Sequence, residues 1–308
     1  MVIQHNIAAI NSYRNLGVNQ GGLNKNLEKL SSGYKINRAG DNAAGLAISE
    51  SMRSQINGLN QAVSNANDAI GLIQTAEGAL TETHSMLQRL VTLASQSANG
   101  TYNSVARANL QSEVENLLDE IDRIANNTDF NGIRPLASKG YDKDTGKTTA
   151  SKGAKPPTSV KVAYGDKMTF QIGPSKVETL KVSKADMTST ALGLSGLTSG
   201  KITSAGRIAV SGDSTIAGNQ AISKINNAIN IVSTYRAKLG AAQNRLEHTI
   251  NNLKVTSENI TAAESRIRDT DMADEITAFT KNNILLQASQ SMLAQSNSVP
   301  QSVLSLLQ

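Results

Sequence analysis

The sequence predicts a mainly α protein: a long antiparallel helical, coiled-coil rod folded back on itself, with a small β-hairpin-containing middle region. Three observations lead to this prediction. All five prolines fall at positions 135, 156, 157, 174 and 300, so residues 1–134 and 175–299 lack the residue that helix interiors tolerate least. Apolar residues recur at heptad spacing within both stretches. The segment between them is rich in Gly, Ser, Thr and Lys, a composition that favours short strands and loops.

A first heptad seam predicts one helix over residues 43–98. Its apolar members are Met52, Ile56, Leu59, Val63, Ala66, Ile70, Ile73, Leu80, Leu87, Val91 and Ala94. Asp41 or Asn42 can cap the start of this helix, and Asn99-Gly100 can end it.

Two further seams predict the helices that pack against the first. The second comprises Leu110, Val114, Leu117, Ile121 and Ile124, and stops before a turn at Phe130-Asn131-Gly132. The third has Ile225, Val232, Leu239, Leu246, Leu253, Ile260 and Ile267 seven residues apart, with Ile229, Arg236, Gln243 and Ile250 among its alternate positions. Each Leu or Ile removed from water contributes about 1.5–3 kcal/mol, so we expect the third helix to fold back on the first two.

The chain therefore divides into three predicted parts. Residues 43–137 with 216–267 form the helical rod, and residues 138–215 form a small β and loop region at its distal end. Residues 1–42 with 268–308 form two amphipathic terminal arms. Their apolar positions are Ile3, Ile7, Ile10, Leu23, Leu27, Leu30, Ile276, Phe279, Leu286, Leu293, Val303 and Leu307. Neither arm has enough apolar surface to fold alone, so we expect disorder in an isolated chain and helix formation on association.

The middle region carries strand-like patterns and an excess of lysine. Alternating or β-branched residues mark strands at residues 160–164, 167–172 and 177–182. Residues 138–184 hold ten lysines and four acidic residues. A nucleic-acid surface would instead show an Arg and Lys stripe on a defined face, so we interpret this excess as a solvated surface without a nucleic-acid partner.

Catalytic, cofactor and metal chemistry is absent from the sequence patterns. The chain has no cysteine, and its three histidines, His5, His84 and His248, do not have metal-ligand spacing. Acidic residues on the second predicted helix are expected to be a solvated face. No apolar run reaches the length of a membrane span, and the N-terminus does not resemble a secretory leader. We expect no enzyme activity, no cofactor and no membrane insertion.

Several segments together resemble the bacterial flagellins. The longest begins Leu27-Glu-Lys-Leu-Ser-Ser-Gly-Tyr and ends Gly-Leu-Ala-Ile-Ser49. Others are Ile73-Gln-Thr-Ala-Glu-Gly-Ala-Leu80, Asn127-Thr-Asp-Phe-Asn-Gly132, Leu239-Gly-Ala-Ala-Gln-Asn-Arg-Leu246, Ala262-Ala-Glu-Ser-Arg-Ile-Arg-Asp269 and Ser289-Gln-Ser-Met-Leu-Ala-Gln295. The likeness covers residues 1–136 and 222–308, and its motifs occur in the family's order.

The resemblance implies a structural subunit of an extracellular filament used for motility. In that family the paired termini form an inner tube, the subunits are exported without a cleaved signal peptide, and they polymerise at the tip under a cap. The implied partners are further copies of the chain, the flagellar export machinery, an export chaperone, the cap protein and the hook-associated junction proteins. Two alternatives are a hook–filament junction protein, which would be made in few copies, and a helical scaffold or enzyme of another class.

Part of the first helix also resembles the flagellin surface that Toll-like receptor 5 recognises. The resemblance places Leu87, Gln88, Arg89, Leu93, Gln96 and, on the next helix, Glu113 in that surface. The alternative interpretation is that Leu87, Leu90 and Leu93 are core residues.

Charged residues gather where the predicted rod meets the arms, at Arg38, Asp41, Arg266, Arg268 and Asp269. One interpretation is helix capping and local ion pairs, which contribute less than about 1 kcal/mol each when exposed. The other is a hinge or a contact between subunits. The sequence favours neither.

Overall fold

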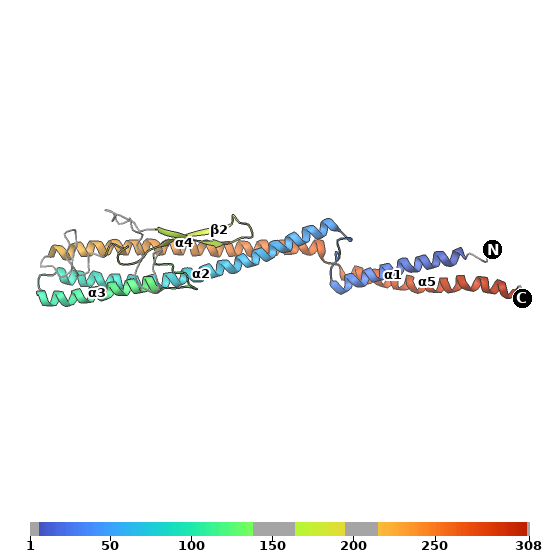
Figure 1. The fold of residues 1–308 in the computed structure, drawn as a ribbon, viewed down its shortest axis with the longest axis horizontal. Helices are drawn as coiled ribbons and strands as arrows, with labels where there is room; N and C mark the ends of the chain where they lie inside the picture. Colours follow the sequence, from blue (N-terminus) through green and yellow to red (C-terminus); the bar gives the residue numbers. More distant parts are fainter. Residues whose placement is uncertain (1–5, 138–163, 195–214, 307–308) are drawn as a thin grey trace. The chain divides into compact units, whose positions relative to one another are not determined.

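The computed structural model describes residues 6–137, 164–194 and 215–306. Within these ranges the chain forms five helices and a two-stranded antiparallel sheet, in the order α1, α2, α3, β1, β2, α4, α5. The mainly α class with a small hairpin, predicted from proline placement and heptad spacing, is thus confirmed (Figure 1).

The chain separates into two compact units. The arm unit comprises residues 1–57 and 255–308, and the bundle unit comprises residues 58–254. The division falls within two long helices, α2 (Ala43–Ala98) and α4 (Thr215–Arg268). The three-part division expected from the sequence stays a prediction.

In the bundle unit α2 packs with α4 and with α3 (Ser104–Asn127), which runs back along it (Figure 1). One side of the first predicted seam forms the core, because Leu59, Ala66, Ile73, Leu80, Leu87 and Ala94 are all buried. Met52 and the alternate positions Ile56, Val63, Ile70 and Val91 are only half-buried, and the core instead takes Ala62, Ala69, Ala76 and Leu90. From α3 the core takes Val114, Leu118, Ile121 and Ala125. Leu110 and Leu117 lie at its edge, half-buried against the same cluster.

The third seam was predicted correctly on one side and mostly wrongly on the other. Ile225, Val232, Leu239, Leu246 and Leu253 are buried at heptad spacing as expected. Of the predicted alternate positions, Ile250 is buried, whereas Ile229, Arg236 and Gln243 are only half-buried. The core at those places instead takes Ala221, Ala228, Tyr235 and Ala242. Small alanines let α4 approach its neighbours closely, and Tyr235 satisfies its hydroxyl by donating to the Ser183 carbonyl at 3.2 Å.

The hairpin consists of β1 (Tyr164–Gln171) and β2 (Thr179–Ala185). Phe170 pairs with Leu180 and Met168 with Val182, so the side chains of one face reach the bundle core. These strands overlap the second and third predicted strands, and the first, residues 160–164, lies almost entirely outside the described residues.

The arm unit contains α1 (Ile7–Ser32) and α5 (Met272–Leu306), packed antiparallel. Asn6 donates to the Ser296 carbonyl at 2.8 Å at one end, and Lys29 pairs with Glu275 at 3.5 Å at the other. We expected both arms to be disordered in an isolated chain; the structure instead shows two helices. The sequence argument treated each arm alone, whereas each provides a packing partner for the other.

The helix ends follow capping rules. The Asn6 side chain accepts the Ala9 amide to cap α1, and the Asn42 side chain accepts the Gly45 amide at 2.9 Å to cap α2. Asp41, the other predicted cap, instead accepts the amides of Asn37 and Arg38 and closes the turn before the helix.

Candidate functional site

The interface between α1 and α5 alternates apolar and polar layers. Leu16, Leu23 and Leu30 on α1 and Phe279, Leu286 and Leu293 on α5 point inward and are half-buried. Between them lie Ser12, Asn19 and Asn26 on α1 and Asn282, Ser289 and Ser296 on α5, each set spaced by seven residues. This seam has a coiled-coil period, but every second layer is polar, so the two helices bury little apolar area between them.

Close contacts in the polar layers define the register of the pair. The Asn19 Nδ2 donates to Ser289 Oγ at 2.8 Å. Gly22 lies where a Cβ would come within 3.0 Å of Asn282 Nδ2, so the absence of a side chain allows the helices to approach. Asn26 is 8% exposed, and its buried Nδ2 has no hydrogen-bond partner among the described residues.

Large apolar side chains instead cover the outside of the helix pair. Ile7, Ile10, Leu27 and Ile276, four of the predicted assembly residues, are exposed, with Ile7 at 62%. The predicted residues Leu23, Leu30, Phe279, Leu286 and Leu293 face the intramolecular seam. Ile3 and Leu307 lie outside the described residues, and the side chain of Val303 is not described. Outward apolar residues that sequence reasoning missed are Tyr13, Val18, Ile284, Leu285, Met292 and Val299. These residues form a second apolar stripe on each arm, and that stripe is the sequence pattern from which they could have been predicted.

The linkers that adjoin the arms are joined to each other by backbone hydrogen bonds. Tyr34 forms an antiparallel bridge with Asp269, the Lys35 amide donates to the Arg268 carbonyl at 2.7 Å, and the Thr270 amide donates to the Gly33 carbonyl at 3.0 Å. Gly33 ends α1 with φ 74°, a left-handed conformation that glycine adopts without strain. We call this joint, residues 33–35 with 268–270, the linker clasp.

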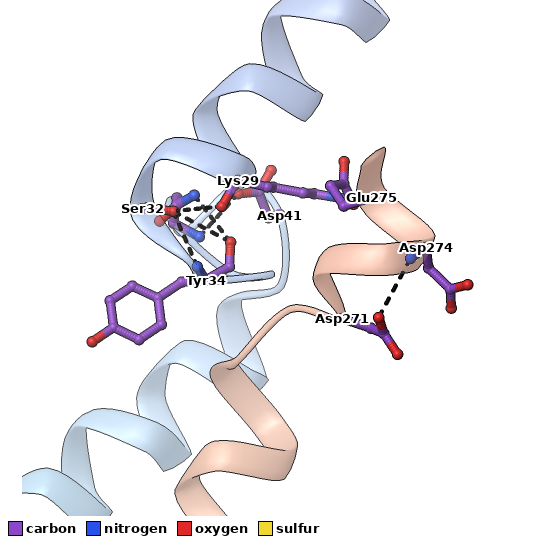
Figure 2. A network of polar contacts seen from close by, with 8 residues as sticks. Lys29, Ser32, Tyr34, Asp41, Asp271, Asp274 and Glu275 are labelled. Carbon is purple, nitrogen blue, oxygen red and sulfur yellow. Dashed lines mark hydrogen bonds and ion pairs between the residues drawn. The ribbon is translucent and has the colours of Figure 1, made fainter. Parts of the chain in front are cut away.

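Side chains on both linkers support the clasp. Figure 2 shows the Ser32 hydroxyl beside the Tyr34 backbone. It also shows Asp271 at the start of α5, close to Asp274. Asp271 accepts the Ala273 amide at 2.9 Å, which caps α5. Ser32 Oγ accepts the Tyr34 amide at 3.1 Å, which fixes the turn that leaves α1.

The predicted junction charges contribute to the same clasp. The Arg268 guanidinium lies 4.6 Å from the centroid of the Tyr34 ring and donates to Glu50 at 2.7 Å. This hydrogen bond holds the pKa of Glu50 below its ordinary value, and Arg53 adds to the effect. The amides of Arg38 and Asn37 likewise lower the pKa of Asp41. Capping and ion pairs are therefore present, and hinge behaviour stays a prediction.

A second candidate surface lies in the bundle unit. Arg89 on α2 pairs with Glu113 on α3 at 2.7 Å, so the structure brings together two residues predicted from separate helices. Gln88 and Gln96 are exposed beside them. Leu87 and Leu93, together with Leu90, are 0% exposed. Their side chains form the core beneath this surface, as the alternative interpretation proposed, and do not reach solvent.

The described residues show no arrangement typical of a catalytic or metal centre. Within them, no three His, Asp or Glu side chains are grouped so that they could hold a metal ion. The imidazole of His84 contacts Gln88 at 3.1 Å, and His248 is exposed on α4. In this part of the chain, no helix combines the length and apolar character that crossing a membrane requires.

Comparison with known proteins identifies the family of the chain. A crystal structure of Bacillus cereus flagellin is 28% identical, with a TM-score of 0.46, and covers 65% of this chain and 94% of that one. The family model for the bacterial flagellin N-terminal helical region matches residues 3–140, and that for the C-terminal helical region matches residues 222–307. A flagellin of Bacillus subtilis is 49% identical and the flagellar filament 33 kDa core protein of Treponema phagedenis is 44% identical, each over 100% of both chains. The chain therefore belongs to the bacterial flagellin family, whose members are structural proteins of the flagellar filament and not enzymes.

Proposed function

We propose that this chain polymerises into an extracellular flagellar filament for motility through the outer surfaces of its α1–α5 pair. The observation that supports this most directly is the exposure of large apolar side chains there, including Val18 at 69% and Met292 at 63%. Exposed apolar surface of this extent typically marks an interaction site. Identical copies that join through different surfaces form an open helical polymer when the rotation between them does not close a ring, which is the geometry of a filament.

Assembly supplies the burial that the pair lacks. The polar layers between α1 and α5 keep the intramolecular interface small, and water covers the outward Ile, Val and Met side chains in a single chain. Covering these side chains with the same helices of neighbouring copies contributes about 25 cal/mol for each Å² of apolar surface removed from water. The free energy that holds the arms in place is therefore supplied largely by the polymer.

We propose further partners from the resemblance to the family. They are the flagellar export machinery, an export chaperone, the cap protein at the growing tip and the hook-associated junction proteins at the filament base. The exposed arms are the surfaces that we assign to these partners, because a chaperone or a junction protein must cover the same apolar side chains before or at the end of polymerisation.

Removal of one arm tests the proposed assembly. Protein lacking residues 1–33 or residues 272–308 should remain soluble and keep the helix content of the bundle unit, yet form no filaments when seeded. Electron microscopy and sedimentation measure the polymer, circular dichroism measures the helices, and the full chain with the same seeds is the control. Normal filaments from either truncated protein would contradict assembly through the arms.

We also propose that the exposed surface around Arg89 and Glu113 is a ligand of Toll-like receptor 5. The support is the resemblance of this segment to the receptor-binding surface of the family, together with the Arg89–Glu113 pair on adjoining helices. Because Leu87 and Leu93 are buried, we narrow the contacting side chains to Gln88, Arg89, Gln96 and Glu113.

A second arginine–glutamate ion pair on the bundle supplies the matched control. Arg89→Ala should weaken binding to the purified receptor ectodomain by roughly tenfold or more if Arg89 is a principal contact. Arg123→Ala removes a similarly exposed arginine, which pairs with Glu120 within α3, and should leave the affinity unchanged. Equal affinities for the wild-type protein and Arg89→Ala would refute receptor recognition by this surface while leaving filament assembly untouched.

A further inference from the structure

A small groove with a basic rim lies between the hairpin and α4 in the bundle unit. Its floor is formed by Leu180, Val182, Tyr235 and Ala242, and its volume is about 230 Å³. Lys181 of β2 and Lys238 and Arg245 of α4 line it and are exposed. We call this site the basic groove.

The size and composition of the groove indicate what it can bind. Pockets for small organic ligands usually range from about 300 to 1,000 Å³, so a drug-sized molecule would not be enclosed here. Lys238 and Arg245 are seven residues apart and lie on one face of α4, separated by about 10.5 Å along the axis. Ala241 and Ala242 lie between them and leave room for carboxylate side chains from another protein surface.

The same chain carries a matching acidic surface on α3. That helix has five carboxylates and two arginines, and its arginines leave three carboxylates in excess. Glu113 and Glu120 pair with Arg89 and Arg123, and Glu115 accepts a hydrogen bond from Gln111 Nε2 at 3.1 Å. Glu115, Asp119 and Asp122 follow one another at steps of four and three, so they form an acidic stripe on one side of the helix.

The outer residues of the acidic stripe have the same spacing as the two basic residues of α4. Glu115 and Asp122 are seven residues apart, as are Lys238 and Arg245, so the two charge rows span the same distance on helices. Asp119 is exposed, and Asp122 is held in place because its carboxylate accepts the Ser189 amide at 2.6 Å and the Ser189 hydroxyl at 2.7 Å. A fixed carboxylate loses little conformational entropy when a partner binds beside it.

We propose that the basic groove of one copy receives the acidic stripe of a second copy, as a lateral contact within the polymer. Figure 1 shows α3 and the hairpin on opposite sides of the bundle unit, so the two surfaces of one copy cannot meet each other. They meet when copies associate side by side, and such a heterologous contact propagates along a filament when its rotation does not close a ring. The inference rests on the proposed filament assembly and adds a charge-based contact to the apolar contacts of the arms.

Two charge-reversed variants test this pairing. The groove-reversed variant carries Lys238→Glu and Arg245→Glu, and the stripe-reversed variant carries Glu115→Lys and Asp119→Lys. Asp122 stays unchanged because it holds Ser189. All four new residues are good helix formers, and circular dichroism with thermal unfolding verifies that each variant keeps the wild-type fold.

Each variant alone places like charges against each other, so its critical concentration for seeded polymerisation should rise roughly tenfold or more. An equimolar mixture of the two should polymerise near the wild-type concentration, because each groove then meets a stripe of opposite charge. The chain that carries all four substitutions should also recover.

The alternatives give different outcomes. Folded variants that polymerise alone as the wild type does, or whose mixture fails to recover, would overturn the proposal. Loss of wild-type binding to phosphatidylglycerol vesicles or to a single-stranded oligonucleotide in the groove-reversed variant, with normal polymerisation, would assign the groove to another partner and overturn it too. If the wild-type chain itself formed no polymer, the filament assignment would fail instead, so the two failures are distinguishable.

Discussion

Replacing outward apolar residues of the arms tests the assembly surface most directly. We consider the double substitution Ile10→Gln and Ile284→Gln, one change on each helix of the arm pair. Ile10 is 55% exposed and Ile284 is 61% exposed in the single chain. Complete burial of an Ile side chain contributes about 1.5–3 kcal/mol, so the part that assembly can still bury contributes about 0.8–1.8 kcal/mol for each residue.

The two residues together should weaken subunit addition by about 1.7–3.5 kcal/mol, which corresponds to a roughly 20- to 300-fold higher critical concentration. Gln has a better helix propensity than Ile, so α1 and α5 should keep their helix content. Monomer that remains after seeded polymerisation, measured by sedimentation, gives the critical concentration, and circular dichroism gives the helix content.

A matched control separates the loss of apolar surface from a general effect of substitution. Asn15→Gln with Asn297→Gln changes two exposed polar positions on the same helices and should leave the critical concentration unchanged. If the Ile variant polymerised at the wild-type concentration, the outward side chains would not be covered in the filament, and assembly through this surface would be refuted.

Three further predictions concern the junction, the core and the seam. The pKa values of Glu50 and Asp41 are lowered, so their stabilisation of the linker clasp is present above their ordinary pKa values of 4.5 and 3.8. This stabilisation is lost as the pH falls through the lower pKa values of the folded chain. Hydrogen-exchange protection of the Lys35 and Thr270 amides should fall in that pH range, and it should fall less steeply in Glu50→Gln. Leu87→Ala should destabilise the bundle by about 3–5 kcal/mol in urea unfolding, whereas Val105→Ala, at a 67% exposed site, should change stability by less than about 0.5 kcal/mol. Asn26→Leu removes a buried side-chain nitrogen that has no hydrogen-bond partner among the described residues, so it should stabilise the arm pair by about 1–2 kcal/mol. Slower hydrogen exchange in α1 would measure this gain. Faster exchange would show that the Asn26 amide supports the pair.

The bundle core could be predicted from the sequence because its signal is local and periodic. Leu59, Ala66, Ile73 and Leu80 form a heptad series in one helix, and burying that series needs no knowledge of distant residues. The second set of seam positions was harder to predict. In α2 and α4 these positions are often alanine, which does not stand out as apolar, so the predicted stripe included Val63 and Ile229 instead of the buried Ala62 and Ala228.

The contacts between distant segments could not be predicted. The linker clasp joins Tyr34 to Asp269, and nothing in either segment identifies the other as its backbone partner. The charges of Arg268 and Glu50 were visible in the sequence, but their 2.7 Å contact depends on two helices whose ends are brought together by the fold. The family resemblance placed Arg89 and Glu113 in one surface, but neither the resemblance nor spacing predicted their ion pair.

The arms show why periodicity alone gives an incomplete account of a helix that assembles. An amphipathic helix is usually interpreted as having one apolar face, which it buries within its own chain. In α1 the inward positions include Ser12, Asn19 and Asn26, while Val18 and Ile10 face solvent. A chain that had to be stable only as a monomer would gain free energy from the opposite arrangement. Because the polar layers still fix the register of the pair through contacts such as Asn19–Ser289, the seam specifies how the arms align while contributing little burial. The apolar surface that would otherwise stabilise the monomer then lies on the outside, where only another copy can cover it.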